Sequence, residues 1–310
     1  MRKGEIAIKA SRYIVQLFFF ILFNIYLFTL IPIFGNTLSF LKRIDLRNLP
    51  LPISFDSPYA NVADAFTVIQ VMIATLWFPA LTIGLTILIS VVFGRVACGW
   101  LCPFGFIQDI LRTLPVRKLK ISHPTNRSLA EVKYYVLLFT ISIVSLLALA
   151  KIYDVKDLLK ALRGFGEAPY TTISPSSTLF GLIPAMIVER KFLELGEQVW
   201  EIFTLNRLFW LRIGILAFAL IIAIYIPRAW CRWFCPIGAL QAIFSKYSFL
   251  GIGRRPAKCL GEKCRLCEKA CPMAIKILEE PWQKIRDREC INCLLCKAVC
   301  PENAIKIVFP

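Results

Sequence analysis

Residues 290–301 read CINCLLCKAVCP, and residues 259–272 read CLGEKCRLCEKACP. The later run has the spacing C-x2-C-x2-C-x3-C-P, in which three closely spaced thiolates bind one [4Fe-4S] cluster and the fourth binds another. The earlier run departs from this spacing, because four residues instead of two separate Cys259 from Cys264. Both prolines lead into the same segment, AIKI, at 274–277 and at 304–307, which predicts two matching short strands. The pattern indicates an internal repeat that holds two clusters.

In two-cluster ferredoxins, the fourth cysteine of each run binds the cluster held by the other run. This rule divides the eight cysteines into two ligand sets. Zinc sites usually take two C-x2-C pairs, and disulfides are unusual in a reducing cytoplasm, so both alternatives are weaker. We therefore expect residues 254–310 to form an α+β domain of the two-cluster ferredoxin type. The expected sets are Cys290, Cys293, Cys296 and Cys271 for one [4Fe-4S] cluster, and Cys259, Cys264, Cys267 and Cys300 for the other.

The rest of the chain is unusually apolar. Of its 310 residues, 57% are hydrophobic and only 18% are charged, and the mean hydropathy is +0.65. A soluble protein is about half apolar and about one quarter charged. Residues 1–250 are therefore predicted to be an all-α membrane domain with four transmembrane helices, each of about 20 apolar residues. The four stretches are Tyr13–Phe34, Ala65–Gly94, Tyr134–Ala150 and Leu208–Pro227.

The net charge of +17 is distributed unevenly between the two sides of the predicted membrane domain. The side with both termini carries 26 of the 37 Lys and Arg residues, and the other side carries 10. Lys and Arg accumulate on the cytoplasmic side of membrane proteins. We therefore expect both termini and the ferredoxin domain to be cytoplasmic. The membrane accounts for the basic charge, so no nucleic-acid partner is expected.

A second pair of cysteine motifs lies inside the membrane domain. Residues 95–108 read RVACGWLCPFGFIQ, and residues 228–241 read RAWCRWFCPIGALQ. The Arg, both Cys, Trp, Pro, Gly and Gln coincide without a gap. Each copy follows a helix that runs towards the cytoplasm, which predicts a parallel internal repeat with matching units at 95–110 and 228–243. Ser57-Pro58 and Ser174-Pro175 form a weaker match in the outer segments.

These motifs predict a third redox site at the inner edge of the membrane. Positions i and i+4 share one helix face, so each motif can present two thiolates together. Two such pairs supply four sulfurs, enough for an iron site or an iron–sulfur centre. The neighbouring Arg95, Arg228, Trp100 and Trp233 are expected to anchor the turns at the interface and to compensate thiolate charge. The alternative, that the cysteines are buried structural thiols, stays open. The four cysteines are Cys98, Cys102, Cys231 and Cys235.

Several kinds of chemistry are excluded within this chain. Its only histidine is His123, and no C-x-x-C-H sequence occurs, so neither a bis-histidine nor a covalently attached haem is expected. Neither G-x-x-x-x-G-K-[ST] nor G-x-G-x-x-G is present, so nothing predicts ATP or NAD chemistry.

The paired C-x3-C-P motifs followed by the eight-cysteine tail resemble the membrane polyferredoxin family. That family includes the quinol-oxidising subunit of periplasmic nitrate reductase systems and the membrane domain of the nitrous-oxide-reductase regulator. The resemblance implies a multi-pass protein of a prokaryotic cytoplasmic membrane. It also implies electron transfer between the quinone pool and a redox partner, another iron–sulfur or cytochrome subunit, as in the quinol-oxidising subunit of a respiratory complex. The alternative is a redox maturation or regulatory protein for a respiratory metalloenzyme.

Overall fold

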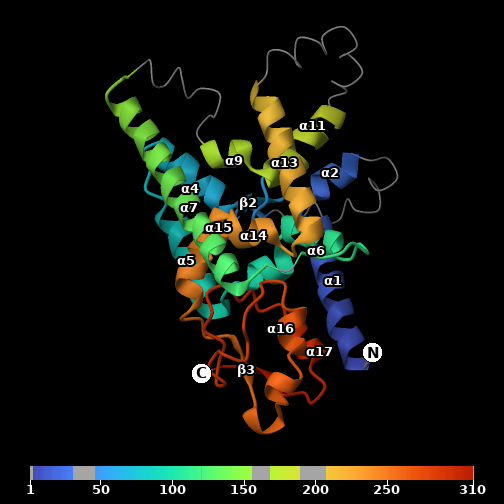
Figure 1. Ribbon diagram of the computed structural model, residues 1–310. Coiled ribbons are helices and arrows are strands. Elements are labelled where there is room, and N and C mark those ends of the chain that lie inside the picture. The colour runs from blue at the N-terminus through green and yellow to red at the C-terminus, as the bar shows by residue number, and fades with distance from the viewer. Residues whose placement is uncertain (1–2, 31–45, 120, 156–167, 189–206, 310) are drawn as a thin grey trace.

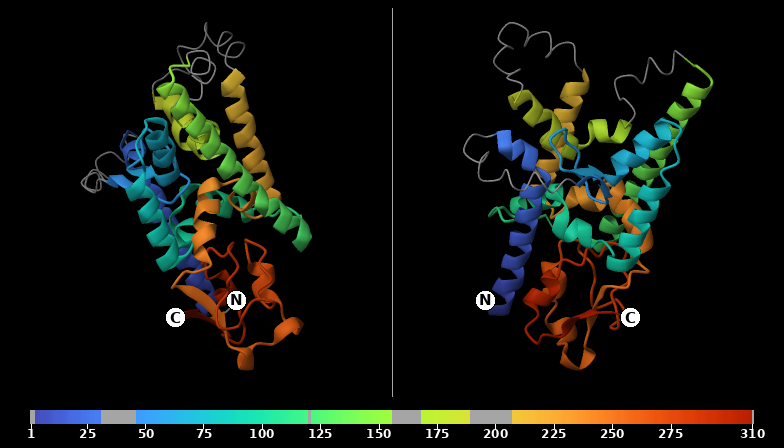
Figure 2. Two further views of the ribbon diagram at one scale, coloured as in Figure 1. Left: turned by 90° about the vertical axis from the view of Figure 1, so that its left-hand side faces the viewer. Right: turned by 180° about the vertical axis from the view of Figure 1, so that it is seen from behind.

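The computed structural model describes residues 3–30, 46–119, 121–155, 168–188 and 207–309. A helical part carries the C-terminal segment, residues 251–309, at one end, and the start of α1 lies at the same end (Figure 1). Views from the side and from behind show the C-terminal segment against the ends of the helices (Figure 2). The N-terminal helix also packs along this segment, because α1 (Lys3–Phe23) contacts α17 (Leu295–Val299).

Three helices among the described residues are long and apolar enough to cross a membrane. They are α1, α7 (His123–Ile152) and α13 (Arg207–Tyr225), with apolar stretches at Ile6–Phe23, His123–Ile152 and Leu208–Tyr225. Many of their apolar side chains point outward, including Phe139, which is 67% exposed, and Ile221. Such surfaces are stable in lipid rather than in water. The expected membrane protein is confirmed.

The second predicted span, Ala65–Gly94, differs from the prediction. It forms two shorter helices, α4 (Ala65–Ala74) and α5 (Ala80–Phe93), instead of one. Pro79 lies between them and has no N–H to continue a helix, and a proline disfavours helical geometry in the residue before it. Leu76 adopts a positive φ of 65° within the same break. The sequence pattern detected the apolar length but not this interruption.

Two segments that were expected outside the membrane fold back into the helical part. The first contains a parallel pair of strands, β1 (Leu46–Leu51) and β2 (Val62–Asp64), with buried residues between them. The second contains α9 (Pro169–Ile173), α10 (Pro175–Ser177), the π-helical turn η4 (Thr178–Leu182) and α11 (Ile183–Val188). Irregular backbone is tolerated at membrane depth only where protein or a polar cavity surrounds it.

The two folded-back segments contact each other through the region of the weak Ser-Pro match. Ser54 Oγ lies 3.0 Å from Ser176 Oγ, and Ser57 Oγ donates to the Phe180 carbonyl at 2.6 Å. Around them, Phe55, Phe104 and Phe180 belong to the main hydrophobic core. This core therefore supports the ends of the helices that carry the cysteine motifs.

Two short helical segments make up each cysteine motif. The first motif spans the π-helical turn η2 (Ala97–Leu101) and α6 (Pro103–Arg112), and the second spans α14 (Ala229–Trp233) and α15 (Pro236–Ser245). Each proline stands in the first turn of its helix, where the missing N–H has no intrahelical partner to lose. Directly after α1 comes the short helix α2 (Ile25–Leu30).

The C-terminal segment has one small antiparallel sheet, in which β3 (Gly251–Arg254) pairs with β4 (Ile305–Val308). Its short helices are η5 (Pro256–Lys258), η6 (Gly261–Lys263), α16 (Leu266–Ala270) and α17. The predicted strand at 304–307 exists, but its counterpart at 274–277 does not. The other side of β3 is occupied instead, because Arg254 N donates to Trp282 O and Ile285 N donates to Ile252 O.

Two carboxylates, the buried Asp109 and the partly buried Glu289, connect distant parts of the chain. Asp109 in α6 pairs with Arg12 from α1 and with Arg228, whose Nε donates to Oδ1 at 3.0 Å. Glu289 in the C-terminal segment pairs with Arg95, at 2.8 Å, and with Lys133 in α7. Arg12, Arg95, Arg228 and Lys133 are almost fully buried. Each carboxylate therefore has two cations, and each centre keeps one excess positive charge.

Asp109→Asn should strongly destabilise the protein. Burial alone raises the pKa of Asp109, but Arg228 and Arg12 outweigh it and hold the pKa at about 2. Loss of the charge leaves two buried guanidinium groups uncompensated, which costs about 3–5 kcal/mol. Thermal unfolding of the purified protein measures the change. In the wild type, the Asp109 contribution is present above pH ~4, the pKa of an unfolded Asp, and is lost as the pH falls towards 2.

The matched control is Glu279→Gln, which removes an exposed carboxylate paired with Lys276. Exposed pairs contribute little to stability, so this variant should unfold at the wild-type temperature. An Asp109→Asn variant as stable as this control would contradict the role assigned to the buried ion pairs.

Candidate functional site

One predicted set of tail cysteines surrounds a small cavity in the C-terminal segment. The cavity is also lined by isoleucine and methionine side chains, among them Ile275, Ile285 and Met273. The lining of this cavity is therefore apolar apart from the sulfurs. The cysteines at the cavity are Cys271, Cys290, Cys293 and Cys296.

The other predicted set surrounds a second cavity on the same segment. Its cysteines are Cys259, Cys264, Cys267 and Cys300. None of these four is buried, whereas Cys293 and Cys296 of the first set are. The longer loop after Cys259 contains Gly261 at φ +60°, with no heavy atom within 4 Å of the position of a Cβ. The second cavity is therefore the more exposed one.

Local backbone geometry explains how short segments present several sulfurs at once. Arg265 and Leu294, the residues before α16 and α17, adopt positive φ, which turns the chain sharply between successive cysteines. The last cysteine of each run ends a helix in extended geometry, directly before its proline. Backbone N–H groups also point at sulfur: Gly261 N lies 3.4 Å from Cys259 Sγ, and Ala304 N lies 3.2 Å from Cys300 Sγ.

The cysteines of each set do not converge as ligands of one ion. Among the described residues, no three His, Cys, Asp or Glu side chains are placed to hold a single metal ion. A cubane cluster stands between its four thiolates and keeps them farther apart than one zinc ion would. Burial raises the pKa of the Cys271 thiol to about 11, so iron binding would have to displace its proton. The two cavities fit a cluster better than a single ion.

The four cysteines of the C-x3-C-P motifs are all buried and come together at the base of the helical part. Contacts run from each motif to the other. Gln108 Nε2 of the first copy donates to Cys231 Sγ at 3.0 Å, and Cys98 Sγ lies 3.7 Å from Oε1 of the equivalent Gln241 in the second copy. Burial raises the pKa of Cys231 to about 11, with Cys98 adding to the effect. The two motifs therefore form one site.

Two expectations about these motifs are wrong. The two cysteines of each motif do not share a helix face, because Cys102 and Cys235 are extended residues that end the preceding turn. Cys102 Sγ instead lies 3.7 Å from the Ser54 carbonyl in the folded-back segment. Arg95 and Arg228 do not anchor the turns at the lipid interface either, because both are completely buried.

The arginine at the start of each motif contacts the other motif. Arg228 Nη1 donates to the Cys98 carbonyl at 2.7 Å, and a Cβ at Gly105 would lie 3.3 Å from Arg228 Nη2. In the same way, a Cβ at Gly238 would lie 2.9 Å from Arg95 Nη2. Each glycine of a C-P-x-G sequence thus leaves room for the arginine of the other copy. Nε and Nη2 of Arg95 are buried and have no hydrogen-bond partner among the described residues.

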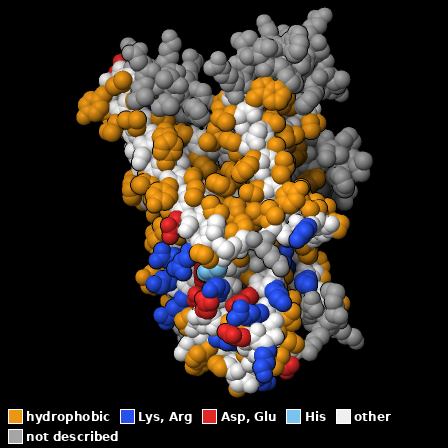
Figure 3. Space-filling view, viewed as in Figure 1, with side chains coloured by type: hydrophobic (Ala, Val, Ile, Leu, Met, Phe, Trp, Pro, Cys, Tyr) orange, Lys and Arg blue, Asp and Glu red, His pale blue; other side chains and the backbone are white. Residues whose placement is uncertain are grey.

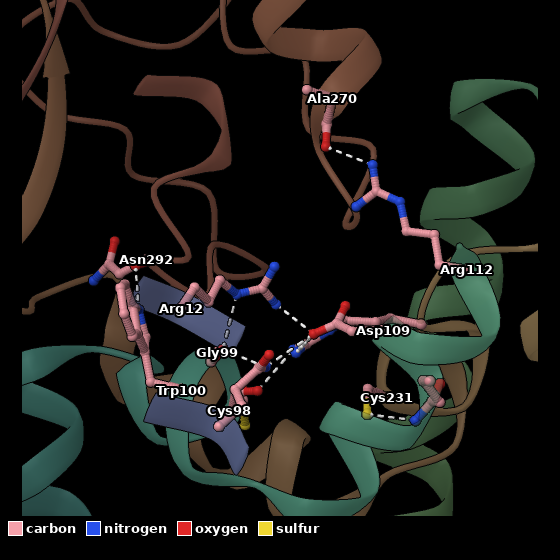
Figure 4. Close-up of polar contacts among 12 residues, drawn as sticks. Arg12, Cys98, Gly99, Trp100, Asp109, Arg112, Cys231, Ala270 and Asn292 are labelled. Carbon is pink, nitrogen blue, oxygen red and sulfur yellow. Dashed lines mark hydrogen bonds and ion pairs between the residues drawn. The ribbon is translucent and has the colours of Figure 1, made fainter. Parts of the chain in front are cut away.

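The C-terminal segment rests directly on the first motif (Figure 4). Trp100 Nε1 donates to the Asn292 carbonyl at 3.0 Å, and Arg112 Nη2 donates to the Ala270 carbonyl at 3.0 Å. A Cβ at Gly99 would lie only 2.4 Å from the Ile291 carbonyl oxygen. Cys98 belongs to the same hydrophobic cluster as Cys293 and Cys296. The cysteines of one tail set and those of the membrane motif are therefore joined by continuous packing.

Several residues of this site were not predicted from the sequence. Asp109, Glu289 and Lys133 form ion pairs in this site. None of them is part of a repeated motif, so the sequence carried no signal for them. For Gln108 and Gln241, the sequence showed only that they occupy the same position in the two motifs, and it did not predict their contacts with the cysteines. The lone His123 lines a cavity beside the C-terminal segment, away from all twelve cysteines.

Comparisons with known proteins match the same regions. A family model described as a 4Fe-4S binding domain matches twice, at residues 73–122 and 207–256, and a second 4Fe-4S binding domain model matches residues 284–306. An uncharacterized protein of Methanocaldococcus jannaschii is 30% identical over 71% of this chain and 67% of its own length. No solved structure matches the chain.

Two further relatives have descriptive names. The putative electron transport protein YccM of Escherichia coli is 26% identical over 69% of this chain and 51% of its own length. The regulatory protein NosR of Stutzerimonas stutzeri is 26% identical over 84% of this chain but only 32% of its own length. Together with the helical part and its docked cysteine-rich segment, these matches show that the chain belongs to the membrane polyferredoxin family of iron–sulfur electron-transfer proteins.

Proposed function

We propose that this protein carries electrons between the membrane quinone pool and a redox partner, another iron–sulfur or cytochrome subunit. The observation that carries the proposal is the docking of the C-terminal segment on the first C-x3-C-P motif. Trp100 bonds to Asn292, Gly99 lies against Ile291, and Cys98 packs with Cys293. This arrangement supports an electron path from the membrane edge to the tail.

The tail would hold two [4Fe-4S] clusters, one in each cysteine-lined cavity. Cys271 is the ligand that crosses over to the set around Cys293, and Cys300 crosses over to the set around Cys264. Each bound cluster would supply a one-electron carrier. The isoleucine side chains around Cys293 would keep water from the sulfurs, and the N–H groups at Cys259 and Cys300 would stabilise thiolate charge.

The four buried motif cysteines would hold a further iron or iron–sulfur centre at the membrane edge. The reciprocal contacts of Gln108 and Gln241 bring the two motifs together and support a parallel repeat. The excess positive charge at the Asp109 and Glu289 centres would offset the negative charge of four thiolates. Arg95, whose Nε and Nη2 are unpaired among the described residues, is the cation best placed for this role.

The reaction would transfer two electrons and two protons for each quinol. Oxidation of the quinol to the quinone releases both, and each of two one-electron carriers accepts one electron while the protons pass to water. The regulatory protein NosR matches over most of this chain, which supports the second candidate, a redox maturation or regulatory protein. Quinol oxidation by the purified wild-type protein discriminates between the two functions.

Gly99→Ala tests the docking that carries this proposal. The new methyl group would collide with the Ile291 carbonyl and push the C-terminal segment away from the first motif. We expect quinol to reduce the tail clusters at least tenfold more slowly, since electron transfer depends on close approach, while dithionite still reduces them fully. Stopped-flow absorbance of the anaerobically purified protein in nanodiscs gives both results.

Gly84→Ala and Gly214→Ala are the matched controls, because no heavy atom lies within 4 Å of a Cβ at either helical position. Both should reduce the clusters at the wild-type rate. Equal rates for Gly99→Ala and these controls would remove the support for an electron path through the first motif.

Iron and acid-labile sulfide analysis with low-temperature EPR tests the three centres separately. We expect about eight iron and eight sulfide per chain from the tail, plus further iron from the motif cysteines. Cys293→Ser should remove one tail cluster and keep the membrane-edge iron, whereas Cys231→Ser should do the reverse, so each variant controls for the other. If Cys231→Ser contains as much iron as the wild type, the motif cysteines are structural thiols.

Reporter fusions test the proposed orientation, in which both termini face the cytoplasm. A reporter after Pro310 or within residues 117–120 should be cytoplasmic, because Lys and Arg are concentrated on this side of the predicted membrane domain. Ser174, although expected outside from the sequence, is buried and unsuitable for a fusion. A reporter after Tyr153, which is 75% exposed at the end of α7, should be external. External labelling of the C-terminus of intact cells would reverse the orientation.

A further inference from the structure

The two cysteine-lined cavities of the C-terminal segment differ in what covers them. The set around Cys293 lies against the first C-x3-C-P motif, where Gly99 packs on the Ile291 carbonyl. Among the described residues, its cavity is lined only by cysteine, isoleucine and methionine side chains. The set around Cys264 lines the other cavity, at which no cysteine is buried. A redox partner of the tail therefore approaches this second set most closely.

Cations surround this more exposed cavity. Lys258 and Arg265 line it, and no carboxylate among the described residues does. Lys263, at the end of η6, directly precedes Cys264. All three cations are exposed, whereas the neighbouring cysteines are only partly so, and an arriving partner therefore meets the cations first. Residues 254–271 contain six cations in all, which are Arg254, Arg255, Lys258, Lys263, Arg265 and Lys269.

The carboxylates of this region do not cancel the excess of cations. Glu262 pairs with Arg265 at 3.2 Å, and Glu268 Oε1 accepts a hydrogen bond from Leu278 N at 3.0 Å. Lys258 and Lys263 make no ion pair with a described residue. Even when Glu302 is counted, which follows Pro301 at the cavity, the region has twice as many cations as carboxylates. Its exposed lysines are therefore free to pair with another molecule.

Two leucines supply an apolar contact within this basic surface. Leu260 and Leu266 line the cavity and are 54% and 42% exposed. An apolar centre with a polar rim is the usual construction of a protein interface. Figure 3 shows charged side chains gathered at the end of the molecule that the C-terminal segment forms, and hydrophobic side chains over the helices. The surface therefore faces water rather than lipid, which favours a protein as its occupant.

We propose that the surface formed by Lys258, Leu260, Lys263, Arg265 and Leu266 is the docking surface for an acidic redox protein. Complementary charge speeds the encounter of two proteins and orients them, and it repels partners of the wrong sign. A carboxylate-rich face around the partner's own redox centre would pair with the lysines and bring that centre towards the second cysteine set. This inference deepens the proposed function, on which it rests for the exchange of electrons with a partner.

Binding of an acidic two-iron ferredoxin of the plant type to the holoprotein in uncharged phosphatidylcholine nanodiscs tests the proposal, with the basic protein cytochrome c as the probe of opposite charge. Fluorescence anisotropy of the labelled probes measures both affinities. The wild type should bind the ferredoxin selectively, and its affinity should fall at least tenfold between about 20 and about 200 mM salt, because salt screens exposed charges. Lys258→Glu/Lys263→Glu should raise the dissociation constant about tenfold, mainly by slowing association. Iron content and EPR spectra unchanged from the wild type show that this variant keeps its clusters.

The matched control is Arg117→Glu/Lys246→Glu, which reverses two exposed cations outside this surface, changes the net charge equally and should bind as the wild type does. The inference is overturned if both double variants bind the ferredoxin equally well, if the wild type does not prefer it to cytochrome c, or if the wild type binds only phosphatidylglycerol vesicles. Quinol oxidation by the wild type would leave the proposed function standing in each case. If the wild type binds the ferredoxin through these lysines but does not oxidise quinol, the docking surface stands and quinone exchange fails.

Discussion

Two carboxylates paired with buried cations, Asp109 and Glu289, hold the parts of this protein together. Asp109 neutralises cations from α1 and from the residue before α14, and Glu289 neutralises cations from the segment between α5 and η2 and from α7. A buried charge without a partner is far more costly than a lost surface pair. The N-terminal helix, both cysteine motifs, α7 and the C-terminal segment must therefore be in place at the same time. The segment with the tail cysteines is fixed to the membrane edge by charge as well as by packing.

The two cysteine motifs are alike in sequence but have different neighbours. In the first motif, Gly99 lies against the Ile291 carbonyl and Trp100 bonds to Asn292. In the second, the residue at the place of Gly99 is Arg232, which pairs with Asn126, and Trp233 bonds to the same amide oxygen at 3.1 Å. The first copy thus receives the C-terminal segment, whereas the second packs against α7. One motif is suited to face the tail and the other to face α7.

Much of the molecule could be predicted from the sequence because its signals are local. Apolar length predicted a membrane protein, and three of the four expected stretches overlap long apolar helices, although the first helix ends at Phe23 and not at Phe34. The spacing of the tail cysteines predicted two sets, and each set lines its own cavity. The break at Pro79 and the missing strand at 274–277 were not predicted, because the first depends on a turn and the second on which segment occupies the edge of β3.

The sequence by itself determined the membrane character, the iron–sulfur chemistry and the pairing of the C-x3-C-P motifs, since composition and ligand spacing are properties of short stretches. The tertiary structure decided which motif receives the tail, where the outer segments fold back and how the buried charges are shared. The need for glycine at position 99 arises only from the Ile291 carbonyl, and the need for glycine at positions 105 and 238 arises only from the arginine of the other motif. Such contacts join residues far apart in the chain, and only the packed chain brings them within reach of each other.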